Sequence, residues 1–531
     1  MAAVLLLAAG LRLASVGFGL PALNDPDEPL FVMTALEMLR DHTLNPGWFG
    51  HPGTTTLYGL ALTSYLAAAT GIVTGRFADA QAFVSAVYAD PGIIFLPGRL
   101  LIVASGVVCV WLTYRIGTRI ADRRIGLLAA FFLAINAVHI QYSQVIRTDV
   151  EASVFMLLAT LRALAIARDG RCRDYVLAGL CVGLACATKW PAAVVVFSPA
   201  CAGLSRIAFD RRALAHLALL ACVSTVTLFC VSPYLLIDYP TVLFDLGGEA
   251  RSAHPGSTGA GFLSNLGWYA THPLLRSFGS AGLILAAVGL VAMARNQAQV
   301  RAAALPGFLM FLVVICAQAL VWERWVVPLL PFAALGIAYA IGAIADLGER
   351  RFGPDARHFA WIGAALVALP MLATTYANTR ERLNDTRQIA ALWVRDHVPP
   401  GSSILVEHAA FDLFRGPWQL RFPVGAAGCI DARPALGGHI RYSRVERLRR
   451  GNPVVDIGYV DARKLTTCRA DFAVFSHYTR YAADRRFAPQ LARYRGLMRG
   501  GLIRAIIRPL PGYSGGPEIV IVETGPGVSR P

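Results

Sequence analysis

Long apolar segments alternate with shorter polar ones along most of the chain. A helix needs about 20 mainly apolar residues to cross a bilayer, and many runs approach or reach that length. The pattern therefore predicts an α-helical polytopic membrane protein with about 11 transmembrane helices. The predicted spans lie at about 3–20, 100–118, 125–139, 150–167, 175–188, 190–204, 214–236, 278–294, 305–321, 325–345 and 359–377.

Arginine separates the loops between these predicted spans into two sets. The arginine-rich set holds Arg115, Arg119, Arg123 and Arg124; Arg168, Arg171 and Arg173; Arg206, Arg211 and Arg212; Arg295 and Arg301; and Arg350, Arg351 and Arg357. Because basic loops stay on the cytoplasmic side of a membrane, we expect these loops to be cytoplasmic. The N-terminus is then cytoplasmic, and loops 21–99 and 237–277 face the outside of the cell inner membrane.

Residues 379–531 lose the long apolar runs. The segment 384–411 predicts a helix, a Pro-Pro-Gly turn and a strand, and the stretches "DFAVFS" and "PEIVIVE" predict further buried strands. Its length of about 150 residues is normal for one domain. We therefore divide the chain into a transmembrane domain, residues 1–378, and an extracytoplasmic soluble α/β domain, residues 379–531. No glycine-rich phosphate loop follows the predicted strand at 403–407.

Composition supports this division. Of the 531 residues, 56% are hydrophobic and only 15% are charged, against about 25% charged in soluble domains. The net charge of +16 comes almost entirely from arginine, since Lys189 and Lys464 are the only lysines. We attribute this charge to the arginine-rich loops that orient the protein in the membrane, and we expect no nucleic-acid partner. Among ten cysteines, Cys429 and Cys468 lie in the predicted outer domain, where an oxidising compartment would favour a disulfide, although spacing alone does not establish one.

The stretch "NDPDEP" places Asp25, Asp27 and Glu28 directly after the first apolar segment. A structural interpretation is available, because Asp25 can cap a helix that begins at Pro26, and acidic residues favour a helix N-terminus. Capping accounts for one or two carboxylates but not for three at a membrane boundary. A carboxylate partly desolvated there is expected to have a raised pKa and to be a better base.

Further candidates lie on the predicted outer side, and the first of them, His51, shares the loop 21–99 with the acidic cluster. His51 precedes a Pro-Gly turn in "WFGHPGTTTLYGL", and Arg147 and Asp149 begin the stretch "RTDVEAS". For Asp149 the structural alternative is a capping box between Thr148 and Glu151.

Three more charged candidates lie beside apolar segments. Lys189 lies in "CATKWP", and Glu323 and Arg324 lie between two predicted spans in "VWERWVV". A lysine or arginine there can be a simple membrane anchor, although arginine also binds phosphate oxygens with two parallel hydrogen bonds. Topology places all these candidates at one membrane boundary, where a lipid head group lies. A divalent metal held by Glu28, His51 and Asp149 stays open, since no tight ligand spacing demands one.

In their order along about 370 residues, these motifs resemble the C-type membrane glycosyltransferases. The resemblance is to glycosyltransferase family 39-like proteins, the bacterial relatives of protein O-mannosyltransferases and of the lipid A aminoarabinose transferase. It is carried by the Asp27–Glu28 pair, "HPG…LYGL", "RTDVEASVFMLLA", "ATKWP", "SPYLLIDYP" and "ERWVVPLLPFAALGIA". Gly53 stands where many relatives have a second proline, which is a departure from the aminoarabinose branch.

The resemblance implies a sugar donor linked to polyprenyl phosphate, an acceptor that is a lipid, a glycan or a protein, and inversion at the anomeric carbon. Asp27, Glu28 and Asp149 would then be the catalytic residues. Asp27 would act as the general base or as the group that orients the acceptor, while Glu28 and Asp149 would shape the acceptor and any metal site. Arg324 and Lys189 would hold the donor phosphate. His51, Arg147 and Glu323 are predicted to bind substrate beside them.

Two other classes are weighed against this one. A lipid or sugar transporter or flippase would also have many spans, but such proteins place their site near the bilayer midplane and often contain inverted repeats. The sequence contains no visible repeat, and its polar candidates lie at the outer edge. A structural or assembly protein would not need the acidic cluster.

Overall fold

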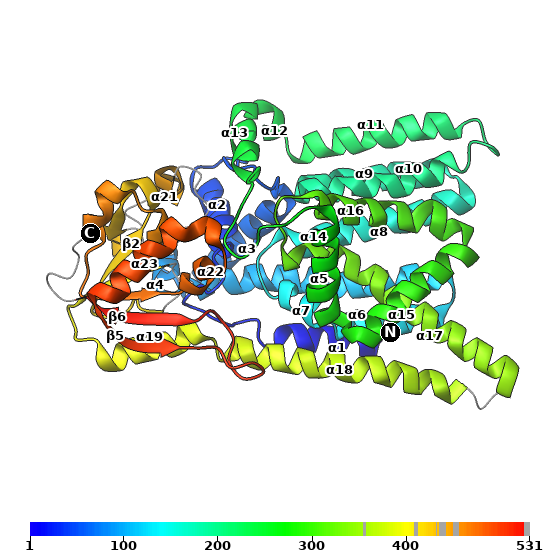
Figure 1. Cartoon of the computed structure of the whole chain (residues 1–531). Coiled ribbons are helices and arrows are strands. Elements are labelled where there is room, and N and C mark those ends of the chain that lie inside the picture. The colour runs from blue at the N-terminus through cyan, green and yellow to red at the C-terminus, as the bar shows by residue number, and fades with distance from the viewer. Residues whose placement is uncertain (354–356, 408–411, 432, 435–441, 450–455, 525–531) are drawn as a thin grey trace.

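The structure, a computed structural model, describes residues 1–353, 357–407, 412–431, 433–434, 442–449 and 456–524. A long helical bundle forms one part of the molecule, and a smaller α/β domain lies beyond one end of it (Figure 1). The loops between residues 14 and 53, together with helix α2 (Glu28–Arg40), lie at the junction of the two parts.

Within the described residues, eight helical segments are long and apolar enough to cross a membrane, or up to nine if the bent pair α6 (Arg123–Ala134) and α7 (Ala137–Ser143) counts as one span. This supports the predicted polytopic fold. The segments comprise α3 (Thr54–Val73), α5 (Gly92–Ile120), α8 (Thr148–Asp169), α11 (Ala213–Val231), α14 with η2 and α15 (Phe262–Asn296), η3 with α16 (Val300–Ala317), η4 with α17 (Glu323–Phe352) and residues Ala360–Leu383 of α18.

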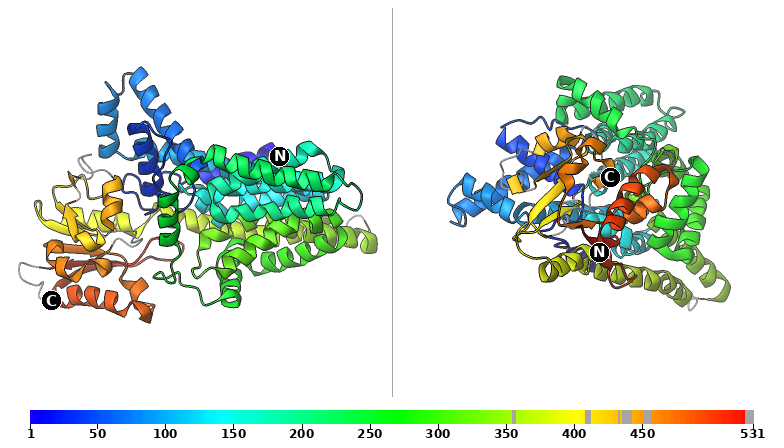
Figure 2. Two further views of the ribbon diagram at one scale, coloured as in Figure 1. Left: turned by 90° about the horizontal axis from the view of Figure 1, so that it is seen from above. Right: turned by 60° about the vertical axis from the view of Figure 1, so that its left-hand side comes forward.

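The predicted set of eleven spans differs from the observed helices in particular places. The first predicted span contains only α1 (Ala2–Leu13), a helix of 12 residues. Residues 175–204 form α9 (Cys172–Thr188), the 3-10 turn η1 (Trp190–Val196) and α10 (Phe197–Leu204), because Pro191 interrupts regular helix after Lys189. Conversely, the sequence predicts an outer loop over residues 21–99, whereas the structure has there the helix α3, which is 20 residues long and apolar. Figure 2 shows α3 and α4 (Ala80–Ala89) projecting beside the junction.

The bundle packs closely around α8 and α17. The side chains of α17 from Leu330 to Ala338 are all buried, and they join α8 in one apolar core. Small residues allow the neighbouring helix α15 (Leu275–Asn296) to approach α17, since a Cβ atom added at Gly289 would lie 1.8 Å from the carbonyl oxygen of Gly336. Such close backbone contact is a general means of packing helices in membranes. A rigid bundle of this kind fixes the positions of the polar side chains at its ends.

The outer domain is built on one six-stranded mixed sheet in the order β3-β2-β1-β4-β6-β5. Strand β1 pairs in parallel with β2 and β4, while the other pairings are antiparallel. The strands are β1 (Ser403–Val406), β2 (Gln419–Pro423), β3 (Cys429–Asp431), β4 (Phe472–Phe475), β5 (Leu502–Ile507) and β6 (Ile519–Glu523). The α-helices among its described residues are α19 (Thr386–His397), α21 (Tyr442–Arg449), α22 (Tyr478–Ala482) and α23 (Ala488–Gly500).

Three predicted strands and one predicted helix of this domain are confirmed: β1, β4, β6 and α19. Cys429 and Cys468 form a disulfide, which ties β3 to the segment that precedes β4. The pairing that spacing left open is therefore present in the structure. The transmembrane helix α18 (Arg357–Leu383) runs almost directly into α19, so the outer domain is attached to the bundle by a very short connection.

Candidate active site

A cavity of about 1720 Å³ lies between the end of the bundle and the outer domain. The loop before α2 contributes Asp25 and Asp27 to its wall, and the bundle contributes Arg147, Asp149 and Arg324. His51 also lines it. Segments that are more than 100 residues apart in the sequence thus supply one polar surface.

Asp27 occupies the N-cap position of α2, but its side chain makes no capping hydrogen bond. It turns toward Arg147, whose guanidinium donates to Oδ2, and Arg324 Nη1 lies 3.7 Å from the same oxygen. The side chain is 40% exposed, which leaves it accessible from the cavity. The capping interpretation therefore does not explain this carboxylate.

The electrostatic surroundings of Asp27 correct one expectation. Burial opposes ionisation of this carboxyl, but the positive charges of Arg147 and Arg324 prevail and hold the pKa of Asp27 below its usual range. The raised pKa expected for a carboxylate at the membrane edge is therefore wrong for the protein without substrate. Asp27 is ionised at neutral pH.

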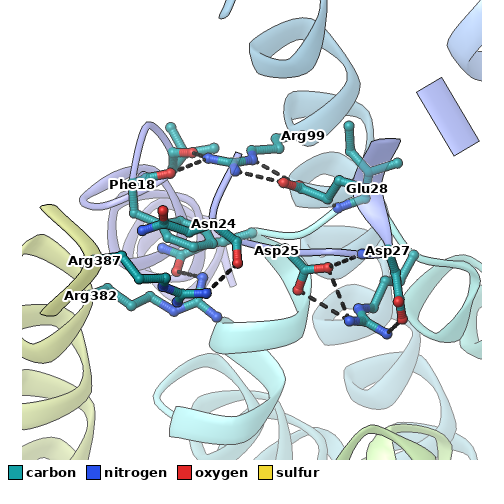
Figure 3. Close-up of polar contacts among 12 residues, drawn as sticks. Phe18, Asn24, Asp25, Asp27, Glu28, Arg99, Arg382 and Arg387 are labelled. Carbon is teal, nitrogen blue, oxygen red and sulfur yellow. Dashed lines mark hydrogen bonds and ion pairs between the residues drawn. The ribbon is translucent and has the colours of Figure 1, made fainter. Parts of the chain in front are cut away.

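Asp25 supports this arrangement from two residues away. It forms an ion pair with Arg147 at 3.0 Å and accepts the backbone N–H of Asp27 at 3.0 Å (Figure 3). Its side chain is only 17% exposed. Asp25 thus fixes both the loop that carries Asp27 and the guanidinium that Asp27 meets.

Glu28 is not among the lining residues of the cavity, and its side chain faces Arg99 (Figure 3). Its carboxylate accepts from Arg99 Nε at 2.8 Å and Nη2 at 2.7 Å, and from the backbone N–H of Ile146 at 2.9 Å. Both side chains are fully buried, and Arg99 also donates to the carbonyl oxygens of Val16 and Phe18. The geometry thus assigns Glu28 to anchoring the loop 16–28 rather than to contact with substrate, in contrast to the catalytic role predicted for it.

We expect Glu28→Gln to destabilise the protein strongly, because Arg99 would keep its buried charge without an opposite charge. Breaking such a pair on one side costs about 3–5 kcal/mol. Thermal unfolding of the purified protein measures the effect, with Asp41→Asn, an exposed carboxylate just after α2, as the matched control. Equal melting temperatures for the two variants would contradict the anchoring role.

Asp149 and Lys189 form a buried ion pair behind the cavity wall. Arg147 occupies the N-cap position of α8 without a side-chain capping bond, and Glu151 instead accepts from Thr56 Oγ1 at 2.6 Å, so no capping box forms. Asp149 lines the cavity, whereas Lys189 is not among the lining residues. Lys189 therefore reaches the site through Asp149.

His51 joins the loop "WFGHPG" to α8. Its Nδ1 lies 3.3 Å from Thr148 Oγ1, and its ring stacks on Trp48. Burial, together with the charges of Lys189 and Arg324, lowers the pKa of His51 to about 3. The imidazole is therefore neutral at pH 7 and offers a hydrogen bond rather than a charge.

Arg324 projects from the start of the short helix η4 (Glu323–Leu329). Its guanidinium stacks over Trp322 at 4.6 Å, and its Nε is buried without a hydrogen-bond partner among the described residues. Glu323, its neighbour in sequence, turns the other way to pair with Arg276 at 2.6 Å and to accept from Tyr142 at 3.1 Å. Arg324 therefore retains hydrogen-bonding capacity for a ligand, while the carboxylate of Glu323 is occupied by Arg276 and Tyr142.

The structure thus brings together Asp27, His51, Arg147, Asp149 and Arg324, and leaves Glu28, Lys189 and Glu323 outside the lining. Within the described residues no group of three or more His, Cys, Asp or Glu side chains is arranged to hold a metal ion.

Sequence reasoning missed Arg99 and Arg387, which hold the loop of the acidic cluster. Arg387 donates to the backbone oxygen of Asn24, and Gln388 accepts from the Asn24 amide at 2.9 Å. A signal for Arg99 existed, because it directly precedes the apolar predicted span 100–118, and a charge at the edge of such a span needs a partner. Arg387 carried no comparable signal, since it lies in a polar helix of the outer domain.

Comparisons with known proteins agree with this architecture. Residues 81–237 match the family model described as dolichyl-phosphate-mannose-protein mannosyltransferase, a range that contains Arg147, Asp149 and Lys189. ArnT from Cupriavidus metallidurans in the apo state is similar over 100% of this chain and 98% of that chain, with 14% identity and a TM-score of 0.57. ArnT bound to undecaprenyl phosphate gives 14% identity and a TM-score of 0.55 over the same shares.

The Archaeoglobus fulgidus oligosaccharyltransferase tethered with an acceptor peptide is similar over 94% of this chain and 72% of that chain, with 13% identity and a TM-score of 0.50. No curated protein sequence matches the chain. The family match over residues 81–237 and the fold shared with ArnT support the predicted resemblance to C-type membrane glycosyltransferases related to family 39.

Proposed function

We propose that the chain transfers a sugar from a polyprenyl-phosphate-linked donor to a hydroxyl or amine of a lipid, glycan or protein acceptor. The observation that carries this proposal is the pairing of Asp27 with Arg324 at 3.7 Å on the wall of one cavity. One residue can take a proton from an acceptor, and the other can receive a phosphate oxygen. The donor class is supported by the similar fold of ArnT, which binds undecaprenyl phosphate.

The chemistry needs one displacement with inversion. The acceptor oxygen or nitrogen attacks the anomeric carbon, the bond from that carbon to the phosphate oxygen breaks, and the acceptor proton passes to the Asp27 carboxylate. The leaving phosphate gains one negative charge. Arg324, with Arg147 behind Asp27, is placed to stabilise that charge, and a preorganised cation in a site that excludes water is effective for this purpose.

Donor binding also changes the basicity of Asp27. Arg147 and Arg324 lower the pKa of this carboxyl in the protein without substrate. A donor phosphate bound to Arg324 neutralises part of that positive charge, so the pKa of Asp27 rises toward its ordinary value. The carboxylate becomes a stronger base when the donor is bound. Removal of the acceptor proton is therefore favoured only when the site contains the donor.

A transporter is the weaker alternative. The polar cluster lies at one end of the bundle next to the outer domain, whereas transporter sites lie near the bilayer midplane. A carboxylate that faces a cation with spare hydrogen-bonding capacity also suits a reaction better than passage of a solute.

We further propose that the site faces the outside of the cell inner membrane, with the N-terminus in the cytoplasm. In a variant without its free cysteines, Gly496→Cys in α23 is expected to react with a membrane-impermeant maleimide in intact spheroplasts, because position 496 is exposed with open space around it. Arg123→Cys at the opposite end of the bundle should react only after lysis. Labelling of position 496 only after lysis would reverse the proposed orientation.

Deletion of the gene tests the function itself. Mass spectrometry of envelope glycolipids, glycans and glycoproteins should reveal one species that becomes lighter by a sugar residue, and the wild-type gene should restore it. A gene that encodes Asp27→Asn should not restore it. An unchanged set of glycoconjugates under conditions in which the protein is made would contradict the proposal.

A further inference from the structure

A second, smaller cavity of about 280 Å³ adjoins the first on the side of the outer domain. The two cavities share the lining residues Asn24, Pro26, Arg387, His477, Arg480 and Gly516. We call the smaller one the side cavity. Asn24 and Pro26 belong to the loop that carries Asp27, so a group held in the side cavity lies directly beside the proposed base.

The two arginines of the side cavity differ in their partners. Arg387 forms an ion pair with Asp385 at 2.7 Å and donates to the Asn24 carbonyl oxygen. Arg480 lines both cavities and forms no hydrogen bond or ion pair with any residue that the structure describes. Its donors therefore point into a space between the domains without a protein acceptor.

The charges around Arg480 favour an anion there. Burial and the like charge of Arg387 lower the pKa of Arg480, which means that its positive charge is poorly compensated. Among the described residues that line the side cavity, the carboxyl is that of Glu407, which accepts from the Tyr494 hydroxyl and from the backbone N–H of Ser476. Burial raises the pKa of Glu407 to about 7, so this group offers Arg480 less negative charge than an ordinary carboxylate.

The rest of the lining suits a sugar. Residues with short polar side chains, Asn24, Ser476 and Thr479, line the same cavity as Arg480, and such groups pair with sugar hydroxyls. A guanidinium binds carboxylate or phosphate oxygens with two parallel hydrogen bonds. Since the donor phosphate is assigned to Arg324 at the bundle end of the main cavity, the anion at Arg480 belongs to the other substrate.

We propose that the side cavity binds an anionic sugar residue of the acceptor, with its carboxylate or phosphate on Arg480. This inference rests on the proposed function, because it takes the occupant of the main cavity to be the donor. It narrows the acceptor to an acidic saccharide, whether that saccharide is free or attached to a lipid.

Binding of small probes to the purified full-length protein tests the inference without any transfer reaction. Saturation-transfer NMR should detect glucose 6-phosphate or glucuronic acid, while glucose should bind at least about tenfold more weakly, since a charge-assisted bond contributes about 1.5–3 kcal/mol. The response to the two anionic probes distinguishes a phosphate from a carboxylate. Equal binding of glucose and of both anionic probes would overturn the proposal.

Variants locate the binding. Arg480→Gln should weaken the preferred anionic probe at least about tenfold, and Arg480→Lys should weaken it less, because the charge remains while the planar fork is lost. Arg485→Gln, which changes an exposed arginine of the same domain outside both cavities, should have no effect. Loss of binding in Arg324→Gln but not in Arg480→Gln would overturn the proposal by moving the anion to the donor end.

A further measurement separates this inference from the function that it extends. Each variant is also tested for binding of polyprenyl phosphate in detergent. Normal lipid binding with unchanged anionic-sugar binding in Arg480→Gln would overturn the side-cavity proposal alone. Absence of polyprenyl-phosphate binding in the wild type would instead contradict the proposed function, whatever the sugar probes do. An unchanged melting temperature of Arg480→Gln shows that its result reflects the site and not the fold.

Discussion

Asp27→Asn is expected to reduce sugar transfer by about 10²–10⁴-fold, the usual contribution of a positioned general base. The amide keeps the size of the side chain but cannot accept the acceptor proton at neutral pH. Because Arg147 also pairs with Asp25 at 3.0 Å, the loop should stay in place and the protein should remain folded. Transfer from a radiolabelled polyprenyl-phosphate sugar pool, with melting temperature measured in parallel, checks both parts.

Asp25→Asn is the matched control for this variant. It removes the same charge two residues away from a side chain that is 17% exposed, against 40% for Asp27. Its effect should be smaller by at least about tenfold, because Asp25 only orients Arg147 and the loop and takes no proton in the proposed step. Turnover of Asp27→Asn at the wild-type rate, or equal losses of activity in both variants, would show that Asp27 is not the general base.

Arg324→Gln is expected to weaken donor binding by about 10–100-fold, which corresponds to the loss of one charge-assisted hydrogen bond to a phosphate. Among the described residues its Nε has no hydrogen-bond partner, and the guanidinium makes a long contact of 3.7 Å to Asp27 and stacks over Trp322. The variant therefore breaks no short ion pair and should disturb the remaining structure little. Equilibrium binding of a fluorescent polyprenyl phosphate to the protein in nanodiscs measures the affinity.

Two companion variants sharpen that experiment. Arg324→Lys should keep part of the affinity, because the charge remains while the planar fork is lost. Arg301→Gln, an exposed arginine near the start of α16, should bind the lipid like the wild type. If Arg324→Gln and Arg301→Gln bound polyprenyl phosphate with equal affinity, the phosphate would have to lie elsewhere.

The sequence carried much of the fold because its signals there are strong. Long apolar helices and buried strands such as β4 and β6 are visible in one pass, since burial demands apolar residues whatever the tertiary context. Elements whose place depends on packing against distant parts of the chain were harder to predict from the sequence. Strand β5 has half-exposed residues, and α3 lies in a segment that the arginine pattern assigned to a loop.

For the site, sequence reasoning recovered the residue types better than their directions. Asp27 and Arg324 could be grouped because each stands at the end of an apolar segment on the same predicted side. Whether a carboxylate faces a cavity or a buried partner depends on distant residues, and neighbours in sequence diverge: Asp27 faces the cavity while Glu28 meets Arg99. The low pKa of Asp27 was missed for the same reason, because it depends on the approach of Arg147 and Arg324.

The central claim is that Asp27 and Arg324 belong to one site, with the acceptor proton at one and the donor phosphate at the other. A cryo-electron microscopy structure of the chain with a non-hydrolysable polyprenyl-phosphate sugar tests this most directly. We expect phosphate oxygens within hydrogen-bond distance of Arg324 and the anomeric carbon on the side that faces Asp27. The account would be contradicted by a phosphate bound away from Arg324, with the Asp27 carboxylate still paired with Arg147 and distant from the sugar.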